Sequence, residues 1–320
     1  MPATGDVPVG AGNITGDRRR RWNTSAVSRS PALARRFFDR FEPVHAVAYF
    51  APEARRAMDE LGLRGFWMGY FAARSAPLGR APAEVVTATF HNFARWRVTA
   101  ALDAAWQRTT PGQAVQARSD GAVAALRRCG LDEHQSLSAT AELAAKAALG
   151  AALDGRPLFA AHAALPWPEE PLARLWHATT LLREHRGDGH VAVLTANGIS
   201  GREANVLHCL SGAVSEHFIR RARDYDDQEW AACRSALAAR GLVAGEELSP
   251  AGRRLKDDIE AATDRLALDA LTALDDAEVE ALFAGLTPLT RLVVAGGDVP
   301  ESTPMGLRRD ELDDNSSGLC

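Results

Sequence analysis

One segment of the chain, residues 175–190, concentrates side chains that can transfer protons. If the segment is helical, His177, Glu184 and Asp188 share one face, because they are seven and eleven residues apart. His190 follows beyond two glycines, each of which costs roughly 1 kcal/mol inside a helix relative to alanine. These residue types favour acid–base chemistry, in which an imidazole exchanges a proton and a carboxylate orients it. A salt-bridged helix at a domain interface would explain the same residues without any chemistry.

A second group of candidates lies in residues 41–50, where Glu42 and His45 form a Glu-x-x-His pattern. In ferritin-like bundles this spacing binds metal together with a second copy on a partner helix. The chain has no second copy, and Pro43 interrupts the pattern. The sequence therefore predicts no metal site. It leaves His45 as a candidate acid or base and Glu42 as a candidate group for orienting a ligand.

Aromatic residues and glycines dominate residues 64–79, and a further aromatic group surrounds His91 and Asn92. Trp67 and Tyr70 offer flat apolar surface, and neighbouring arginines can clamp an anionic group. Apolar walls with a few polar groups are typical of a small-molecule pocket. They are equally typical of an aromatic core in which two helices cross closely.

The residues that could act on a ligand fall into two classes. The candidate catalytic residues are His45, His91, His177, Glu184, Asp188 and His190. The candidate substrate-binding residues are Glu42, Arg64, Trp67, Tyr70, Arg74, Asn92 and Arg183. We expect no cofactor, because the sequence contains neither a phosphate-binding glycine loop nor a nucleophile motif.

The composition is that of an ordinary globular chain of 320 residues, 46% hydrophobic and 24% charged. A net charge of -4 gives no general attraction to nucleic acid or acidic membranes. The four cysteines form no CxxC pair, which favours a reducing cytoplasm. No apolar run approaches the roughly 20 residues that span a bilayer, and the N-terminus lacks the pattern of a signal peptide. We therefore expect a cytoplasmic protein without a membrane partner.

Helical periodicity dominates residues 31–294, so the sequence predicts a mainly α fold with strand confined to one hairpin. The turn Pro166-Trp167-Pro168 is the expected junction between two halves. Residues 82–106 are predicted to form one long helix. The expected divisions are a disordered arm (1–30), an N-terminal helical domain (31–165), a winged-helix-like domain with a short β-hairpin wing (166–294) and a disordered tail (295–320).

Residues 226–266 follow the order of a recognition helix, a hairpin wing and a further helix. Ser249 is the expected N-cap of that further helix, and Pro250 its first residue. Proteins that read DNA need Lys and Arg here, because phosphate contacts supply most of the affinity. Between Asp226 and Ser249, however, the sequence contains five carboxylate residues and only two arginines. This acidic recognition helix and wing disfavour DNA as a partner.

At these residues the chain resembles an actinobacterial family of helix-turn-helix-like proteins, with a MarR-like winged helix in the C-terminal half. The resemblance extends over most of residues 31–290. The strings that carry it are Glu42-Pro43-Val44-His45, Arg64-Gly65-Phe66-Trp67 and His185-Arg186-Gly187-Asp188-Gly189-His190. It implies a helix-turn-helix fold and DNA binding. Because similar proteins occur in antibiotic-producing bacteria, it also implies a role in specialised metabolism. It implies no particular catalytic residue.

Three functions are consistent with these observations. The favoured one is a small-molecule-binding protein or metal-independent enzyme of specialised metabolism on a degenerate winged-helix scaffold. Its acid–base chemistry would be elimination, isomerisation or intramolecular ring closure of a metabolite. The second is a MarR-like, ligand-responsive DNA-binding regulator that dimerises and contacts phosphates through the basic residues 217–223. The third is a non-catalytic subunit whose partner protein is a biosynthetic enzyme.

Overall fold

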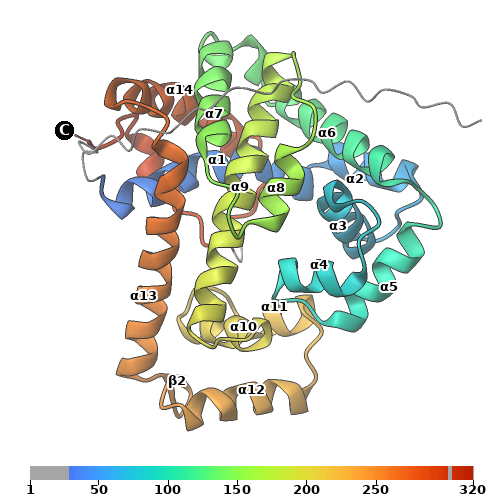
Figure 1. The fold of residues 1–320 in the computed structure, drawn as a ribbon, viewed down its shortest axis with the longest axis vertical. Coiled ribbons are helices and arrows are strands. Elements are labelled where there is room, and N and C mark those ends of the chain that lie inside the picture. Colours follow the sequence, from blue (N-terminus) through green and yellow to red (C-terminus); the bar gives the residue numbers. More distant parts are fainter. Residues whose placement is uncertain (1–28, 302–304, 320) are drawn as a thin grey trace, which may run out of the picture.

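The computed structural model describes residues 29–301 and 305–319. These residues form fourteen α-helices and one two-stranded antiparallel sheet, which confirms the predicted mainly α fold (Figure 1). None of these helices combines the length and apolar character needed to cross a membrane. The helices of the first half are α1 (Pro31–Phe50), α2 (Pro52–Glu60), α3 (Phe66–Ser75), α4 (Ala83–Phe90), α5 (Arg95–Ala105), α6 (Pro111–Arg128), α7 (Leu137–Gly150) and α8 (Pro157–Ala163). The later elements are α9 (Pro171–Ala196), α10 (Gly201–Leu210), α11 (Glu216–Ala222), α12 (Asp227–Ala239), β1 (Val243–Ala244), β2 (Glu247–Leu248), α13 (Pro250–Ala267) and α14 (Asp276–Ala295).

Helix α9 runs through the middle of the molecule, from the end where α7 lies to the end where α10 lies (Figure 1). Pro171 occupies its first turn, where the missing N–H is not needed. Buried residues such as Leu175 and Leu181 are spread around most of its circumference, as expected for a helix enclosed by neighbours. It packs against α1, α6, α7, α8 and α13. Helix α9 therefore fixes the side chains of residues 183–190 between several other helices.

The largest hydrophobic core crosses the junction that was expected at residue 166. It combines Phe41 of α1 and Leu126 of α6 with Leu175 of α9 and Phe283 of α14. The first half of α9 and all of α14 thus belong to the same core as the N-terminal helices. We call this part of the protein the helical body. The expected boundary at residue 166 does not separate two cores.

The helices α10 to α13 and the hairpin form a second core around Trp230, Leu237 and Leu248. We call this part the winged-helix-like unit. Strand β1 pairs antiparallel with β2, and Val243 lies opposite Leu248. The Ser249 side chain accepts a hydrogen bond from a backbone N–H in the first turn of α13, so the predicted cap is confirmed. The predicted short β-hairpin is confirmed as well.

The single helix predicted over residues 82–106 is wrong, because α4 ends at Phe90 and α5 begins at Arg95. His91 interrupts the helix with a φ of 58°, which is uncommon for a residue other than glycine. Its carbonyl oxygen packs against the start of α10. A Cβ added to Gly201 would lie 1.8 Å from that oxygen, so only glycine permits this approach. The break brings the α4–α5 connection onto the winged-helix-like unit.

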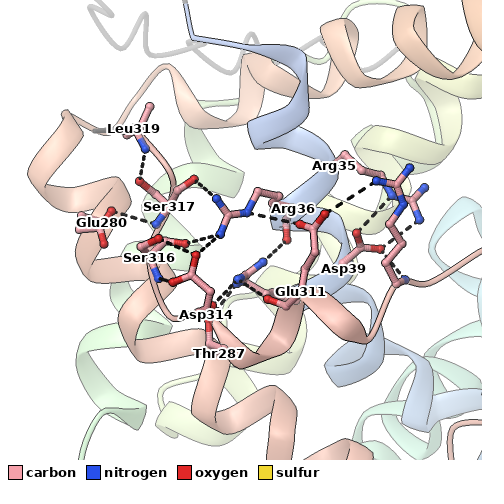
Figure 2. Close-up of polar contacts among 12 residues, drawn as sticks. Arg35, Arg36, Asp39, Glu280, Thr287, Glu311, Asp314, Ser316, Ser317 and Leu319 are labelled. Carbon is pink, nitrogen blue, oxygen red and sulfur yellow. Dashed lines mark hydrogen bonds and ion pairs between the residues drawn. The ribbon is translucent and has the colours of Figure 1, made fainter.

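The C-terminal segment, residues 305–319, packs against α1 and α14, so the predicted disorder of the tail is wrong for these residues (Figure 2). The fully buried guanidinium of Arg40 donates to the backbone oxygens of Asp314 at 2.6 Å and Glu311 at 3.1 Å. It also donates to the hydroxyl of Thr287 at 2.8 Å. These bonds hold the segment because a buried cation without partners is very unfavourable.

The predicted disordered arm, residues 1–30, lies outside the described residues except for Arg29 and Ser30. Ser30 caps α1 by accepting a hydrogen bond from the amide of Ala32 at 3.3 Å. Arg29 donates to the backbone oxygen of Leu274 at 2.8 Å. The end of the predicted arm is therefore part of the helical body.

Candidate functional site

A cavity of about 240 Å³ lies between the helical body and the winged-helix-like unit. Side chains of α1, α9, α10, α11 and α13 line it together with the α4–α5 connection and Met305 of the C-terminal segment. Its wall combines apolar groups with several ionisable ones, as small-molecule sites usually do. The candidate residues that line it are Glu42, His91, Asn92, Arg183 and His190.

Glu42 is the most unusual group in the cavity wall. It is fully buried, and neither carboxyl oxygen has a hydrogen-bond partner among the described residues. The nearest cationic atom is Nε of Arg183, 3.8 Å from Oε1. Burial raises the pKa of Glu42 to about 7, and the attraction of Arg183 only partly opposes this. Near neutral pH Glu42 can therefore both accept and donate a proton, as a general acid–base group must.

A buried ion-pair network holds Arg183 beside Glu42. Both carboxylate oxygens of Glu184 accept hydrogen bonds from Arg74, at 2.9 and 2.8 Å, and one also accepts from Arg183 at 2.8 Å. Burial raises the pKa of Glu184, but the two guanidiniums outweigh burial and hold that pKa well below its usual range. Glu184 therefore stays ionised. Its geometry suits positioning of the two arginines better than proton exchange.

His91 and Asn92 enter the cavity wall at the break between α4 and α5. The Nε2 atom of His91 is buried and has no hydrogen-bond partner among the described residues. Burial lowers the pKa of His91, so its imidazole is neutral near pH 7. The backbone oxygen of Asn92 accepts a hydrogen bond from the Asn205 side chain at 2.9 Å. This bond ties the α4–α5 connection to α10.

Helix α13 supplies polar lining residues that the sequence analysis missed. Lys256, Glu260 and Thr263 are four and three residues apart and share one helix face. That spacing of polar groups on an amphipathic helix is the signal that could have identified them. Lys256 pairs with Glu260, and the hydroxyl of Thr263 is 2.9 Å from Nδ1 of His190. Burial lowers the pKa of His190 to about 4, so His190 is neutral at pH 7.

His45 and His177 do not line the cavity. His45 is fully buried with both ring nitrogens occupied, by the hydroxyls of Thr180 at 3.0 Å and Tyr49 at 2.9 Å. His177 packs edge-on against the ring of Trp167, with centroids 4.8 Å apart. Burial lowers the pKa of His177 to about 4. Both imidazoles are therefore neutral parts of the interior.

Asp188 also has a local role. Its Oδ2 atom accepts hydrogen bonds from the amides of Leu158 and Phe159, both at 2.9 Å. These amides lie in the first turn of α8, where backbone N–H groups have no partner within the helix. Asp188 therefore joins α8 to α9, and it does not line the cavity.

The aromatic segment around α3 is mostly core. Arg64 is exposed and lies in neither of the cavities described here. Trp67 packs against Phe93 with ring centroids 5.4 Å apart, within an aromatic cluster. Tyr70 and Arg74 line a second, smaller cavity of about 30 Å³. Of the two interpretations of this segment, the close aromatic core describes most of its residues.

Ion pairs occupy the face of the winged-helix-like unit that would meet DNA. Arg234 on α12 pairs with Glu246 of the hairpin at 2.8 Å. Glu229, also on α12, accepts from Arg202 at 2.6 Å. A cation already neutralised by a carboxylate has less to gain from a phosphate, so these arginines do not offset the acidic residues of the face.

The basic segment 217–223 is divided between surface and interior. The Arg223 guanidinium lies over the ring of Phe93, 4.2 Å from its centroid, and the residue is 9% exposed. Arg220 pairs with two carboxylates, those of Glu216 and Asp227. Among the described residues only Arg221 and His217 of this segment remain exposed or half-buried without an ion pair. Fewer residues of segment 217–223 are therefore available for phosphate contacts than the sequence predicted.

Comparison with known proteins gives one match. A model described as a helix-turn-helix family matches residues 34–300. The matched range includes every helical residue that lines the larger cavity, as well as α12 and the hairpin. No curated protein and no solved structure matches the chain.

Replacing Glu42 with glutamine is expected to stabilise the protein more at high pH than at low pH. The pKa of Glu42 is about 7 in the folded protein and ordinarily 4.5. Between these values the folded protein keeps a proton that the unfolded chain has released, so stability falls as pH rises. Glutamine does not ionise, so the variant loses this dependence of stability on pH. The stability of Glu42→Gln relative to wild type should therefore rise by roughly 2–3 kcal/mol from about pH 5 to about pH 8.

Urea unfolding of both proteins at the two pH values measures this difference, in which the contributions of all other groups cancel. Glu247→Gln, in the exposed hairpin, is the control and should show little change with pH. A Glu42→Gln effect that does not vary with pH would contradict the raised pKa.

Proposed function

The chain belongs to the helix-turn-helix family, and we propose that it binds a small polar metabolite and acts on it by proton transfer. The observation that carries this proposal is Glu42, a fully buried carboxyl group without a hydrogen-bond partner, in the wall of the larger cavity. Buried polar groups are almost always hydrogen-bonded. A bound ligand that offers a proton or an N–H or O–H group would supply the missing partner.

The neighbours of Glu42 suit such a reaction. In its ionised form Glu42 removes a proton from the ligand, and Arg183 stabilises the negative charge that develops. Glu184 holds Arg183 at this position by accepting a hydrogen bond from its guanidinium at 2.8 Å. Glu42 then returns the proton to another atom of the ligand or to a leaving group. Elimination, isomerisation and intramolecular ring closure all follow this pattern.

The shape of the cavity limits the ligand to a compact molecule. Its volume of about 240 Å³ is below the range of roughly 300–1,000 Å³ typical of sites for drug-sized ligands. Phe38 and Ile259 supply apolar surface, and Arg186 adds a second cation that is already paired with Asp264 at 2.6 Å. This lining suits a compact ligand with one anionic or strongly polar end, and we propose that it is a small metabolite of specialised metabolism.

Wild-type protein should retain specific metabolites from a bacterial extract, and a variant with a filled cavity should not. Ala204 lines the cavity without carrying charge, so Ala204→Phe blocks the space and leaves the ionisable groups in place. Ultrafiltration followed by mass spectrometry measures the retained molecules. Glu247→Gln in the exposed hairpin is the matched control and should retain the same set as wild type.

For any retained molecule that wild type converts, Glu42→Gln should lower the turnover rate by about 10²–10⁴-fold, because it cannot exchange a proton. Arg183→Gln should weaken both binding and turnover. If Ala204→Phe retains the same molecules as wild type, ligands do not bind in this cavity and the proposal fails.

A ligand-responsive, MarR-like DNA-binding regulator is the second candidate, favoured by the family match and by the place of the cavity. Helices α10, α11 and α13 contribute to its wall, so a ligand there would contact the winged-helix-like unit directly. The paired arginines and the acidic first turn of α12 are the observations against it.

If the protein is a regulator, a gel-shift titration with the DNA upstream of its own gene should show a specific complex that weakens steeply with salt. We expect only weak, non-specific binding at about 50 mM salt. Arg221→Gln tests the remaining exposed arginine of residues 217–223 and would abolish a genuine phosphate contact. A specific, salt-sensitive complex lost in this variant would replace the first proposal with the second.

A further inference from the structure

The smaller cavity lies apart from the larger one and has a different chemical character. Its volume is about 30 Å³, and helices α1, α2, α3 and α6 contribute its lining. Besides the exposed Arg55, four polar side chains line it, and each can donate a hydrogen bond. They are Tyr49, Tyr70, Arg74 and Arg118. Neither Asp nor Glu lines this cavity among the described residues.

Arg118 is a buried cation without a carboxylate partner. It is 4% exposed, and among the described residues it takes part in no ion pair. Its guanidinium donates to Nε2 of His162 at 3.0 Å and approaches the hydroxyl of Tyr49 at 3.4 Å. It also lies 5.4 Å from the ring centroid of Trp176. Buried charges are normally paired, so Arg118 lacks its usual counter-charge.

His162 cannot supply that counter-charge. Burial lowers its pKa to about 3, so the imidazole is neutral near pH 7. Its Nδ1 atom lies 2.8 Å from the backbone oxygen of Leu158, which can only accept, so Nδ1 carries the proton. Nε2 is therefore the neutral acceptor of the bond from Arg118. Every polar contact of Arg118 described here is with an uncharged group.

Arg74 adds to the positive potential of the cavity. Its carboxylate partner, Glu184, is shared with Arg183 and so neutralises Arg74 only in part. Arg74 also donates to the hydroxyl oxygen of Tyr70 at 2.9 Å. Because that oxygen is an acceptor in this bond, the phenolic proton of Tyr70 is available to a further acceptor. Two guanidiniums and a phenol thus converge on one small space.

We propose that this cavity is a binding site for a small inorganic monoanion of the size of chloride. A volume of about 30 Å³ has room for two or three water-sized atoms, at roughly 10–15 Å³ each, which suits chloride better than phosphate or an organic acid. Chloride would accept hydrogen bonds from Arg118 and Tyr70 and neutralise the buried guanidinium. It would also join α6 to α3 through these side chains. This proposal does not rest on Glu42 or on the ligand proposed for the larger cavity.

Thermal unfolding in mixtures of sodium chloride and sodium gluconate at constant ionic strength tests the proposal. Because the ionic strength is constant, general screening is the same in every mixture, and gluconate serves as the bulky reference anion. The unfolding midpoint should rise with the chloride concentration and then follow the logarithmic dependence expected for one binding site. Bromide should replace chloride. Equal midpoints in chloride and gluconate would mean that only water occupies the cavity, and would overturn the proposal.

Variants locate the effect. Arg118→Gln should weaken chloride binding by at least about tenfold, because a charged hydrogen bond is lost. Tyr70→Phe should weaken it less. Arg55→Gln is the control, because Arg55 lines the same cavity but is exposed and already paired with Asp59 at 3.1 Å. An undiminished chloride effect in Arg118→Gln would contradict the site.

If Arg118→Gln does not fold, bromide-soaked crystals of the wild-type protein give the answer directly. An anomalous peak between Arg118 and Tyr70 is expected. Its absence at bromide concentrations that saturate the thermal shift would overturn the proposal, and the Glu42 cavity would be unaffected by either result.

Discussion

The ion pairs of Glu184 with Arg74 and Arg183 are the constraint on which both cavities depend. Three charges are buried together, at N–O distances of 2.8–2.9 Å, where α3 meets α9. Such a group is stable only while every member keeps its partners, because removal of one leaves a buried charge uncompensated. The shared carboxylate fixes Arg183 on the side of Glu42 and Arg74 on the side of the smaller cavity. It cannot fully neutralise either arginine, so a positive potential remains on both sides.

The larger cavity exists because the helical body and the winged-helix-like unit meet without filling the space between them. Helix α9 extends from one to the other, and the break at His91 brings the α4–α5 connection against Gly201 at the start of α10. A helix-turn-helix arrangement is usually explained by nucleic-acid contact through its recognition helix. Here the arginine of α12 that faces the hairpin is paired with Glu246. Glu42 and the Nε2 atom of His91, which have no hydrogen-bond partner among the described residues, lie in the cavity wall. The wall of the larger cavity therefore offers more unpaired groups to a ligand than the DNA-facing side of α12 and the hairpin offers to phosphates.

Local signals in the sequence predicted part of this structure well. Ser249 and Pro250 marked the start of α13, and the polar turn before them marked the hairpin, because caps and tight turns depend on neighbouring residues. The break at His91 was not predicted, since the contact that accompanies it is with Gly201 of α10, far along the chain. The packing of residues 305–319 was missed for the same reason, because a polar segment is ordered here by partners such as Arg40. Glu42 was selected for its spacing to His45, although its burial and its proximity to Arg183 are what distinguish it.

The proposed chemistry requires that the carboxyl group of Glu42 change its protonation state near neutral pH inside the cavity. The most direct measurement is a carbon-13 NMR titration of protein labelled at the glutamate carboxyl carbons, with Glu42→Gln to assign the signal. We expect a carboxyl resonance with a pKa of about 7 that disappears in the variant. If the signal lost in Glu42→Gln titrates instead near the ordinary value of 4.5, Glu42 is not the proton-exchanging group and the proposed chemistry is contradicted.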